Sequence, residues 1–171
     1  MPRVAVVGSF NVDHVWRVPT LPQPGATLSG DYASGPGGKG FNQAMAARRA
    51  GAQSSFICAL GGDLGAQLAR ALCTADGIDL RDAQSDAPTG TAGIYVDAAG
   101  RNTIVIGAGA NATLGEDFVA ASLATLQRGD VVLAQLESPL DAVAQTLRAG
   151  RQAGTTTILN PAPANAAAPG A

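Results

Sequence analysis

The sequence predicts an α/β domain built on a doubly wound, mainly parallel sheet with helices on both faces. Short apolar runs of strand length alternate along the chain with longer segments whose apolar residues recur at helical spacing. Strands separated by helices pair in parallel, and a parallel sheet is covered on both faces. The chain has 171 residues and 46% of them are apolar, enough for one domain with a continuous core.

Each element of this alternation has its own signal. Strands are predicted where short runs rich in apolar or β-branched residues end at glycine or at an Asn-Pro pair. These runs are 4–8, 54–60, 131–136 and 155–159. Helices are predicted where Ala- and Leu-rich segments present one apolar face. These segments are 42–49, 64–75, 116–126 and 140–149.

Two extended stretches break the alternation. One flanks a Pro-rich turn, with extended chain at 14–18 and 26–33. The other is a predicted hairpin, with strands at 92–96 and 102–106 around the segment DAAGR. We interpret these stretches, about 14–34 and 91–107, as a small β lid attached to the main sheet, whose natural use is to cover a site at the sheet edge.

Composition excludes several classes of function. Charged residues make up 14% of the chain, the formal net charge is -2, and Lys and Arg form no cluster, so nucleic-acid binding is not predicted. No apolar run reaches the roughly 18 residues that a membrane span requires. The apolar run near the N-terminus is too short for a signal peptide, so we expect a cytoplasmic protein.

The cysteines and the histidine give no sign of a metal site or of nucleophilic catalysis. Cys58 and Cys73 do not form a C-x-x-C pair, and we predict that both are reduced and buried. His14 is the only histidine, so a His-rich zinc site cannot form and a catalytic triad would depend on this one residue.

The segment GPGGKG, residues 35–40, is the most informative part of the chain. It contains a formal G-x-G-x-x-G, but a dinucleotide fingerprint follows the first strand directly, and here that strand ends at Gly8. Asp63 lies near the spacing of a ribose-binding acid, so a nicotinamide-dependent oxidoreductase stays open as an alternative. The segment is not a phosphate-binding P-loop, because Gly40 follows Lys39 where a Ser or Thr is required.

Polar side chains gather at the predicted strand ends. Asn11 and Asp13 follow the first strand, and Glu137 follows the strand at 131–136. Ligands of open parallel sheets bind at the carboxyl ends of strands, so these residues are expected to meet over the glycine segment. Lys39 would add a cation there, and the following helix would point its N-terminus at the same place. Such a set suits a polyhydroxylated ligand.

Five motifs, in order and at similar spacing, resemble the ribokinase-like (phosphofructokinase-B type) family of carbohydrate kinases. They are GSFNVD at 8–13, GGKGFNQA at 37–44, GAGAN at 107–111, QLESP at 135–139 and LNPAP at 159–163. The resemblance therefore runs from the first predicted strand to the last. It implies the ribokinase-like form of the α/β fold, with the lid over the sugar.

The resemblance also implies an activity. Members of the family phosphorylate a sugar primary hydroxyl with ATP, here most specifically D-ribose to ribose 5-phosphate, with Mg²⁺ and K⁺ as further cofactors and a homodimer formed through the lid. Fructokinases and nucleoside kinases share the scaffold and stay open as alternatives. By resemblance, the substrate-binding residues are Asn11, Asp13, Gly37, Gly38, Lys39, Asn42 and Glu137.

Two departures from the family pattern matter. The segment GGDLG at 61–65 is one residue shorter than in the family. The family's C-terminal half, with a Gly-Ala-Gly-Asp anion hole, its catalytic Asp and a potassium site, has no counterpart. We therefore expect residues 1–161 to be the sugar-binding N-terminal part, residues 162–171 to be a flexible Pro/Ala-rich tail, and the catalytic base to lie outside this chain. A non-catalytic sugar-binding module is the alternative.

Overall fold

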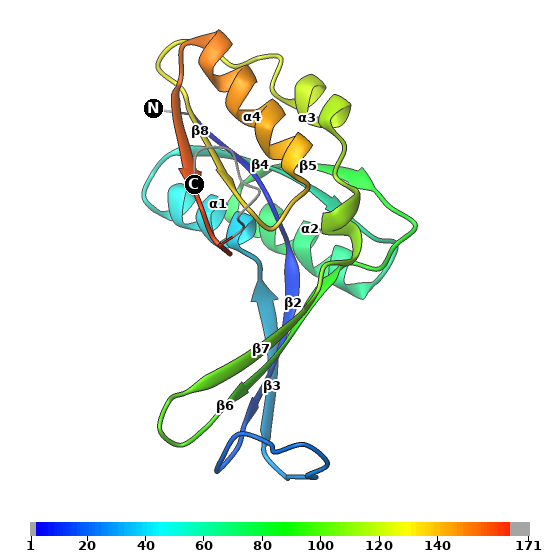
Figure 1. The fold of residues 1–171 in the computed structure, drawn as a ribbon. Coiled ribbons are helices and arrows are strands. Elements are labelled where there is room, and N and C mark those ends of the chain that lie inside the picture. The colour runs from blue at the N-terminus through cyan, green and yellow to red at the C-terminus, as the bar shows by residue number, and fades with distance from the viewer. Residues whose placement is uncertain (1–2, 165–171) are drawn as a thin grey trace.

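The computed structural model describes residues 3–164 and contains two sheets (Figure 1). The main sheet has five parallel strands in the order β5-β4-β1-β8-β9. These strands are β1 (Arg3–Val7), β4 (Gln53–Leu60), β5 (Asp79–Gln84), β8 (Val131–Gln135) and β9 (Thr156–Asn160). The predicted parallel α/β sheet is confirmed.

Strand β5 is the one strand of the main sheet that the sequence did not predict. It reads DLRDAQ and has no fully buried residue. It lies at the edge of the sheet, where it pairs only with β4. An edge strand of this kind can carry polar side chains along most of its length, so it lacks the apolar run that marks a central strand.

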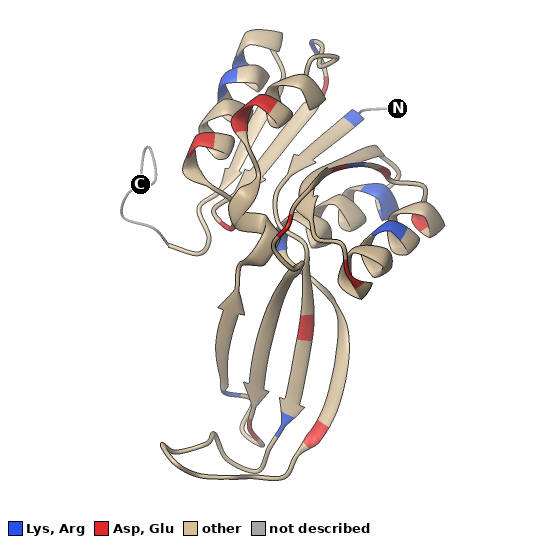
Figure 2. Ribbon diagram, turned by 90° about the vertical axis from the view of Figure 1, so that its right-hand side faces the viewer, with Lys and Arg blue, Asp and Glu red and all other residues tan. Residues whose placement is uncertain are grey.

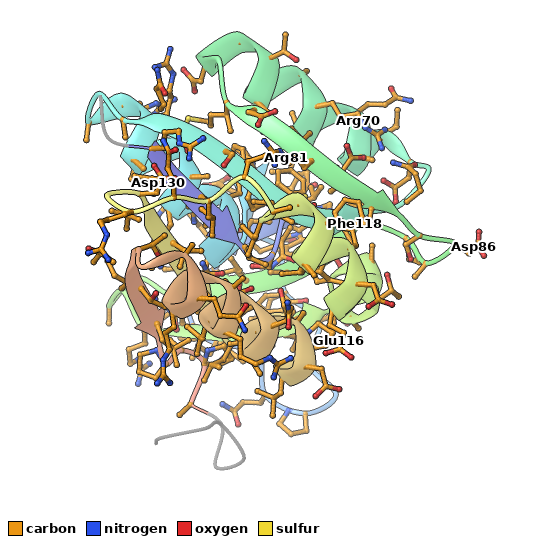
Figure 3. The ribbon with its side chains drawn as sticks, turned by 90° about the horizontal axis from the view of Figure 1, so that it is seen from above. Arg70, Arg81, Asp86, Glu116, Phe118 and Asp130 are labelled. Atoms are coloured by element: carbon orange, nitrogen blue, oxygen red, sulfur yellow. The ribbon has the colours of Figure 1, made fainter. Side chains whose placement is uncertain are left out.

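Helices cover both faces of the main sheet, as predicted. They are α1 (Lys39–Arg49), α2 (Leu64–Asp76), α3 (Glu116–Ser122) and α4 (Leu140–Ala153). Alternate residues of a strand point to opposite faces, and β4 follows this rule. Phe56 and Cys58 pack in the core beneath α1 and α2, while Ile57 and Ala59 pack in the core beneath α3 and α4. Figure 3 shows the strands between these two layers.

Helix α3 is shorter than predicted. It ends at Ser122, although the apolar spacing continues to residue 126. Leu123 and Leu126 still contact the same core cluster as α3, but they do so from the turn that leads to β8. The apolar pattern therefore identified the core residues correctly and the secondary structure of the last turn wrongly.

The sequence suggested that residues 35–40 form a single loop before a helix that begins at Asn42. The structure differs from this expectation. Gly35 and Gly37 belong to a strand, and helix α1 already begins at Lys39. Gly40 lies in the first turn of α1, where an added Cβ would come within 2.6 Å of the carbonyl carbon of Gly8. Glycine is needed here because the helix touches the backbone at the end of β1.

The second sheet is formed from the two stretches that broke the strand–helix alternation, and we refer to it as the lid. Its strands are β2 (Asn11–Arg17), β3 (Asp31–Gly37), β6 (Gly90–Val96) and β7 (Asn102–Gly107), in the order β3-β2-β6-β7. Strand β2 is antiparallel to β3 and parallel to β6. The lid projects well beyond the α/β body (Figure 1), and its charged residues are sparse (Figure 2). The stretch predicted at 26–33 becomes a strand only from Asp31 onward.

Three further sequence expectations concern the cysteines, membrane-spanning helices and the C-terminal tail. Cys58 and Cys73 are free and buried as predicted, and burial raises the pKa of Cys73 to about 11. Within residues 3–164, no helix is both long and apolar enough to cross a membrane. At the predicted tail, the carbonyl of Ala162 accepts a hydrogen bond from the N–H of Leu136. Residues 165–171 of that tail lie outside the described part.

Asp63 joins α2 to the base of the lid. Its carboxylate caps α2 by accepting from the N–H of Ala66, and it accepts from both the N–H and the hydroxyl of Thr89, just before β6. Desolvation raises the pKa of Asp63, but the hydrogen bonds from Thr89 and Ala66 outweigh it and hold the pKa below its usual value. The segment GGDLG thus serves as a helix start and as a lid anchor.

We predict that Asp63→Asn lowers the free energy of unfolding of the full-length protein by about 1–3 kcal/mol at pH 7, because its amide would turn a donor toward Thr89. A lowered native pKa stabilises the fold above the unfolded-state pKa, and this contribution is lost as the pH falls through the native value. The difference from wild type should therefore shrink in acid. Urea titrations at several pH values measure it.

Asp86→Asn is the matched control, because Asp86 projects from the edge of the molecule (Figure 3) and is exposed. Equal stability of the two variants at pH 7 would contradict the anchoring role of Asp63.

Candidate sugar-binding site

The candidate site lies where the carboxyl ends of β1 and β8 meet. These strands are parallel neighbours, so the residues that follow them reach the same edge of the sheet. A cavity of about 590 Å³ opens at this edge. Asn11, Asn111 and Glu137 give it polar walls, and Ile106 and Leu136 give it apolar walls. The cavity therefore offers hydrogen bonds on one side and apolar contact on the other.

Glu137 is the polar centre of the site. Its Oε2 accepts hydrogen bonds from the Ser9 hydroxyl at 2.6 Å and from the Lys39 N–H at 2.9 Å. Its Oε1 lies 3.5 Å from the Lys39 ammonium. Helix α1 has no side-chain cap of its own, so Glu137 takes that place. A carboxylate at this end is stabilised by the helix dipole.

Asp13 lies beside this group on β2. An added Cβ at Gly37 would collide with the Asp13 carboxylate, so this side chain fits only because Gly37 lies under it. Burial and the negative charge of Glu137 raise the pKa of Asp13 above its ordinary value, and the nearby His14 acts in the opposite direction. The negative charge of Asp13 is therefore disfavoured at this position.

Asn11 is buried at the start of the lid. Its Oδ1 accepts a hydrogen bond of 2.8 Å from the Nδ2 of Asn111. Asn111 also bonds both backbone groups of Phe10, donating to the carbonyl and accepting from the N–H. Sequence reasoning assigned no role to Asn111, although it ends the motif GAGAN. The contact joins residues about a hundred positions apart, so no local sequence pattern predicts it.

The remaining predicted residues surround this centre at different distances. Gly38 caps α1 with φ +90°, and a Cβ there would lie 2.7 Å from the carbonyl oxygen of Ser9, so only glycine fits. Lys39 follows directly and pairs with Glu137. Asn42 lies in the first turn of α1 with an exposed side chain. Of the predicted residues, only Asn11 and Glu137 line the cavity itself; those that do not are Asp13, Gly37, Gly38, Lys39 and Asn42.

The structure gives no support to the dinucleotide alternative. Gly35 and Gly37 lie in an antiparallel lid strand rather than in a turn after a parallel strand. Asp63 is occupied by α2 and Thr89. His14, the only histidine, lies 2.8 Å from the Tyr32 hydroxyl on the other face of β2 from Asp13. Among residues 3–164, no three His, Cys, Asp or Glu side chains come together as a metal site.

Comparison with known proteins identifies the family. A family model described as the pfkB family of carbohydrate kinases matches residues 1–170. The chain belongs to this family. A curated ribokinase of Haemophilus influenzae is 40% identical over 164 residues, which cover 94% of this chain and 54% of the relative. The predicted membership of the ribokinase-like carbohydrate kinases is thereby confirmed.

Solved structures agree with this assignment. A ribokinase structure from Giardia lamblia matches with a TM-score of 0.89 and 36% identity, over 98% of this chain and 53% of that one. A ribokinase of Arabidopsis thaliana, solved in complex with ribose and ATP, matches with a TM-score of 0.72 and 29% identity, over 92% and 52%. This pfkB chain spans about half the length of the curated ribokinases it matches.

We predict that Asp13→Asn stabilises the full-length protein at pH 7 while weakening its site. A carboxyl group with a raised native pKa destabilises the fold as the pH rises from the unfolded-state pKa through the native pKa, and the amide removes that charge. The gain should vanish in acid, where Asp13 is protonated in both states. Thermal melts at pH 3 to 8 measure the effect.

Asp31→Asn provides the comparison, since Asp31 is exposed on neighbouring strand β3. A loss of stability in Asp13→Asn at pH 7, with Asp31→Asn unchanged, would overturn the argument that Asp13 is held in the site at a cost.

Proposed function

We propose that this chain forms the sugar site of an ATP-dependent kinase that converts D-ribose to ribose 5-phosphate. The observation that carries the proposal is the gathering of Asn11, Asp13 and Glu137 at the carboxyl ends of β1 and β8. The match to proteins named ribokinase supports it, as does the likeness to a ribokinase solved with ribose and ATP.

The chemistry of the site suits a sugar. Each sugar hydroxyl both donates and accepts, so a site that binds several of them needs groups of both kinds. Asp13 and Glu137 accept when ionised, while Asn11 and Lys39 donate. The apolar side chains of Ile106 and Leu136 offer contact to the C–H face of a sugar ring. We assign Gly37, Gly38 and Asn42 to the same site, the glycines through close backbone approach.

The proposed reaction is an in-line phosphoryl transfer. The primary hydroxyl oxygen of the sugar attacks the γ-phosphorus of ATP, the bond to the β,γ-bridging oxygen breaks, ADP leaves, and a base takes the hydroxyl proton. Residues of this chain hold and orient the sugar, and none of them is assigned as the base. Mg²⁺ and K⁺ belong to the proposal as cofactors, but neither is given a ligand within residues 3–164.

We place this reaction in the cytoplasm, where ATP is available and where Cys58 and Cys73 would stay reduced. The lid would exclude water from the sugar during transfer. It also carries exposed apolar side chains on β7, at Ile104, Val105 and Ile106. We infer that a second copy of the protein covers part of this surface and that the enzyme is a homodimer.

ADP release by the full-length protein tests the proposed activity. With ATP, Mg²⁺ and K⁺ present, D-ribose should give the highest kcat/KM among D-ribose, D-fructose and adenosine. Asp13→Asn should lower kcat/KM for ribose by about 100-fold, since it removes an acceptor that faces the sugar, whereas Asp31→Asn should not. Faster turnover of fructose or adenosine would identify another kinase of the family, and ribose binding without turnover would support a sugar-binding module.

The dimer makes a separate prediction. Sedimentation of the full-length protein should give the mass of two copies, and Ile104→Lys should shift it toward one, because a buried ammonium in an apolar interface is costly. Val105→Lys is the matched control, because it places the same charge on the opposite face of the same strand. A wild-type monomer, or Ile104→Lys protein that remains dimeric, would contradict pairing through this face.

A further inference from the structure

The side-chain amide of Asn111 forms hydrogen bonds with both backbone groups of a single residue, Phe10. The N–H of Phe10 donates to Asn111 Oδ1 at 3.0 Å, and Asn111 Nδ2 donates to the carbonyl of Phe10 at 3.0 Å. A backbone N–H can only donate and a carbonyl can only accept. The amide of Asn111 therefore has one permitted orientation, because the reversed amide would place donor against donor and acceptor against acceptor.

The second N–H of Asn111 Nδ2 continues this chain of hydrogen bonds. It donates to Asn11 Oδ1 at 2.8 Å. Since the Asn111 side must be the donor, Asn11 must present its oxygen there. The NH₂ group of Asn11 then points away from Asn111. Both residues line the cavity, and they are only 4% and 3% exposed, so water cannot easily replace a lost bond.

Packing holds the pair in this arrangement. Gly90, at the start of β6, lies against both side chains, and an added Cβ there would collide with Asn111 Nδ2 and Asn11 Oδ1. Gly109 begins the 3₁₀ turn (Gly109–Thr113) that carries Asn111, and a Cβ there would collide with the carbonyl of Pro88. Glycines at these two positions therefore leave the room that the Asn11–Asn111 pair and the turn occupy.

We propose that Asn111 is a positioning residue that fixes Asn11 with its NH₂ group directed at the ligand. The inference rests on the proposed sugar site. It adds an orientation rule to that site: beside the acceptors Asp13 and Glu137, Asn11 is a fixed donor, so the ligand oxygen nearest to it must accept a hydrogen bond. Asn111 itself acts through Asn11.

Asn111→Asp tests the rule with almost no change of shape. The new carboxylate still accepts from the Phe10 N–H, but it can donate neither to Asn11 nor to the Phe10 carbonyl. The Asn11 amide should then reverse, so that its NH₂ meets the carboxylate and its oxygen meets the sugar. Ribose should bind about 10- to 100-fold more weakly to the full-length protein in calorimetry, as expected for an unmade bond to a buried group.

A double-mutant cycle separates positioning from a purely structural role. Asn11→Ala alone should weaken ribose binding, and adding Asn111→Asp to Asn11→Ala should weaken it little further, because the orientation to be fixed is gone. Additive losses in the cycle, with all variants folded by thermal melt, would overturn the proposal. So would wild-type affinity in Asn111→Asp.

Amide hydrogen exchange in wild-type protein decides the orientation without any variant at position 111. The NH₂ protons of Asn111 should exchange slowly, those of Asn11 should exchange faster, and only the Asn11 pair should become protected when ribose is added. The opposite order of protection would refute the inference. Failure of ribose to bind at all would count against the proposed function, while the exchange order in the free protein would still test the amide orientation.

Discussion

The site depends on the contact between Glu137 and the first turn of α1. This one carboxylate accepts from Ser9 and from the N–H of Lys39, so it ties the end of β8 to the β1–β2 turn and to α1. The contact is possible only because Gly40 allows α1 to touch the backbone at Gly8. A bulkier residue at either glycine would push the helix away and separate Glu137 from the groups it binds.

The lid depends on the same edge of the sheet. Each of its inner strands is joined to the body by hydrogen bonds with a polar side chain: Asn111 binds Phe10 just before β2, and Asp63 binds Thr89 just before β6. Both contacts include hydrogen bonds with backbone groups. Breaking them would leave buried polar groups unpaired, which costs free energy. These contacts fix the base of the lid to the α/β body, and the rest of the lid projects beyond it (Figure 1).

The sequence was informative wherever local pattern and tertiary structure agree. The central strands are apolar and the helices have one apolar face, so both could be predicted from spacing. Strand β5 could not, because at the sheet edge its polar side chains need no partner inside the core. The motif residues Asn11, Asp13 and Glu137 could be assigned to one site because parallel strands end at one edge.

The roles of Asn111 and of the Glu137 cap lay beyond prediction. Both depend on contacts between residues about a hundred positions apart, and such contacts leave no spacing rule in the chain. The glycines at 35–40 show the converse problem. Their clustering suggested one loop, but they perform separate tasks: Gly37 makes room for Asp13, Gly38 adopts a positive φ, and Gly40 permits close packing.

The charge arrangement limits the kind of ligand that this site can take. A helix N-terminus ordinarily favours an anion, but in α1 the Lys39 N–H already binds Glu137, and the Gly40 N–H faces the Ser9 hydroxyl. The Lys39 ammonium is also paired with Glu137, which leaves the charge of Asp13 without a cationic partner of its own. A phosphate placed here would meet a negative group and find no free helix donor. An uncharged polyol is not repelled in this way, so the charge arrangement favours an uncharged polyhydroxylated ligand over an anion.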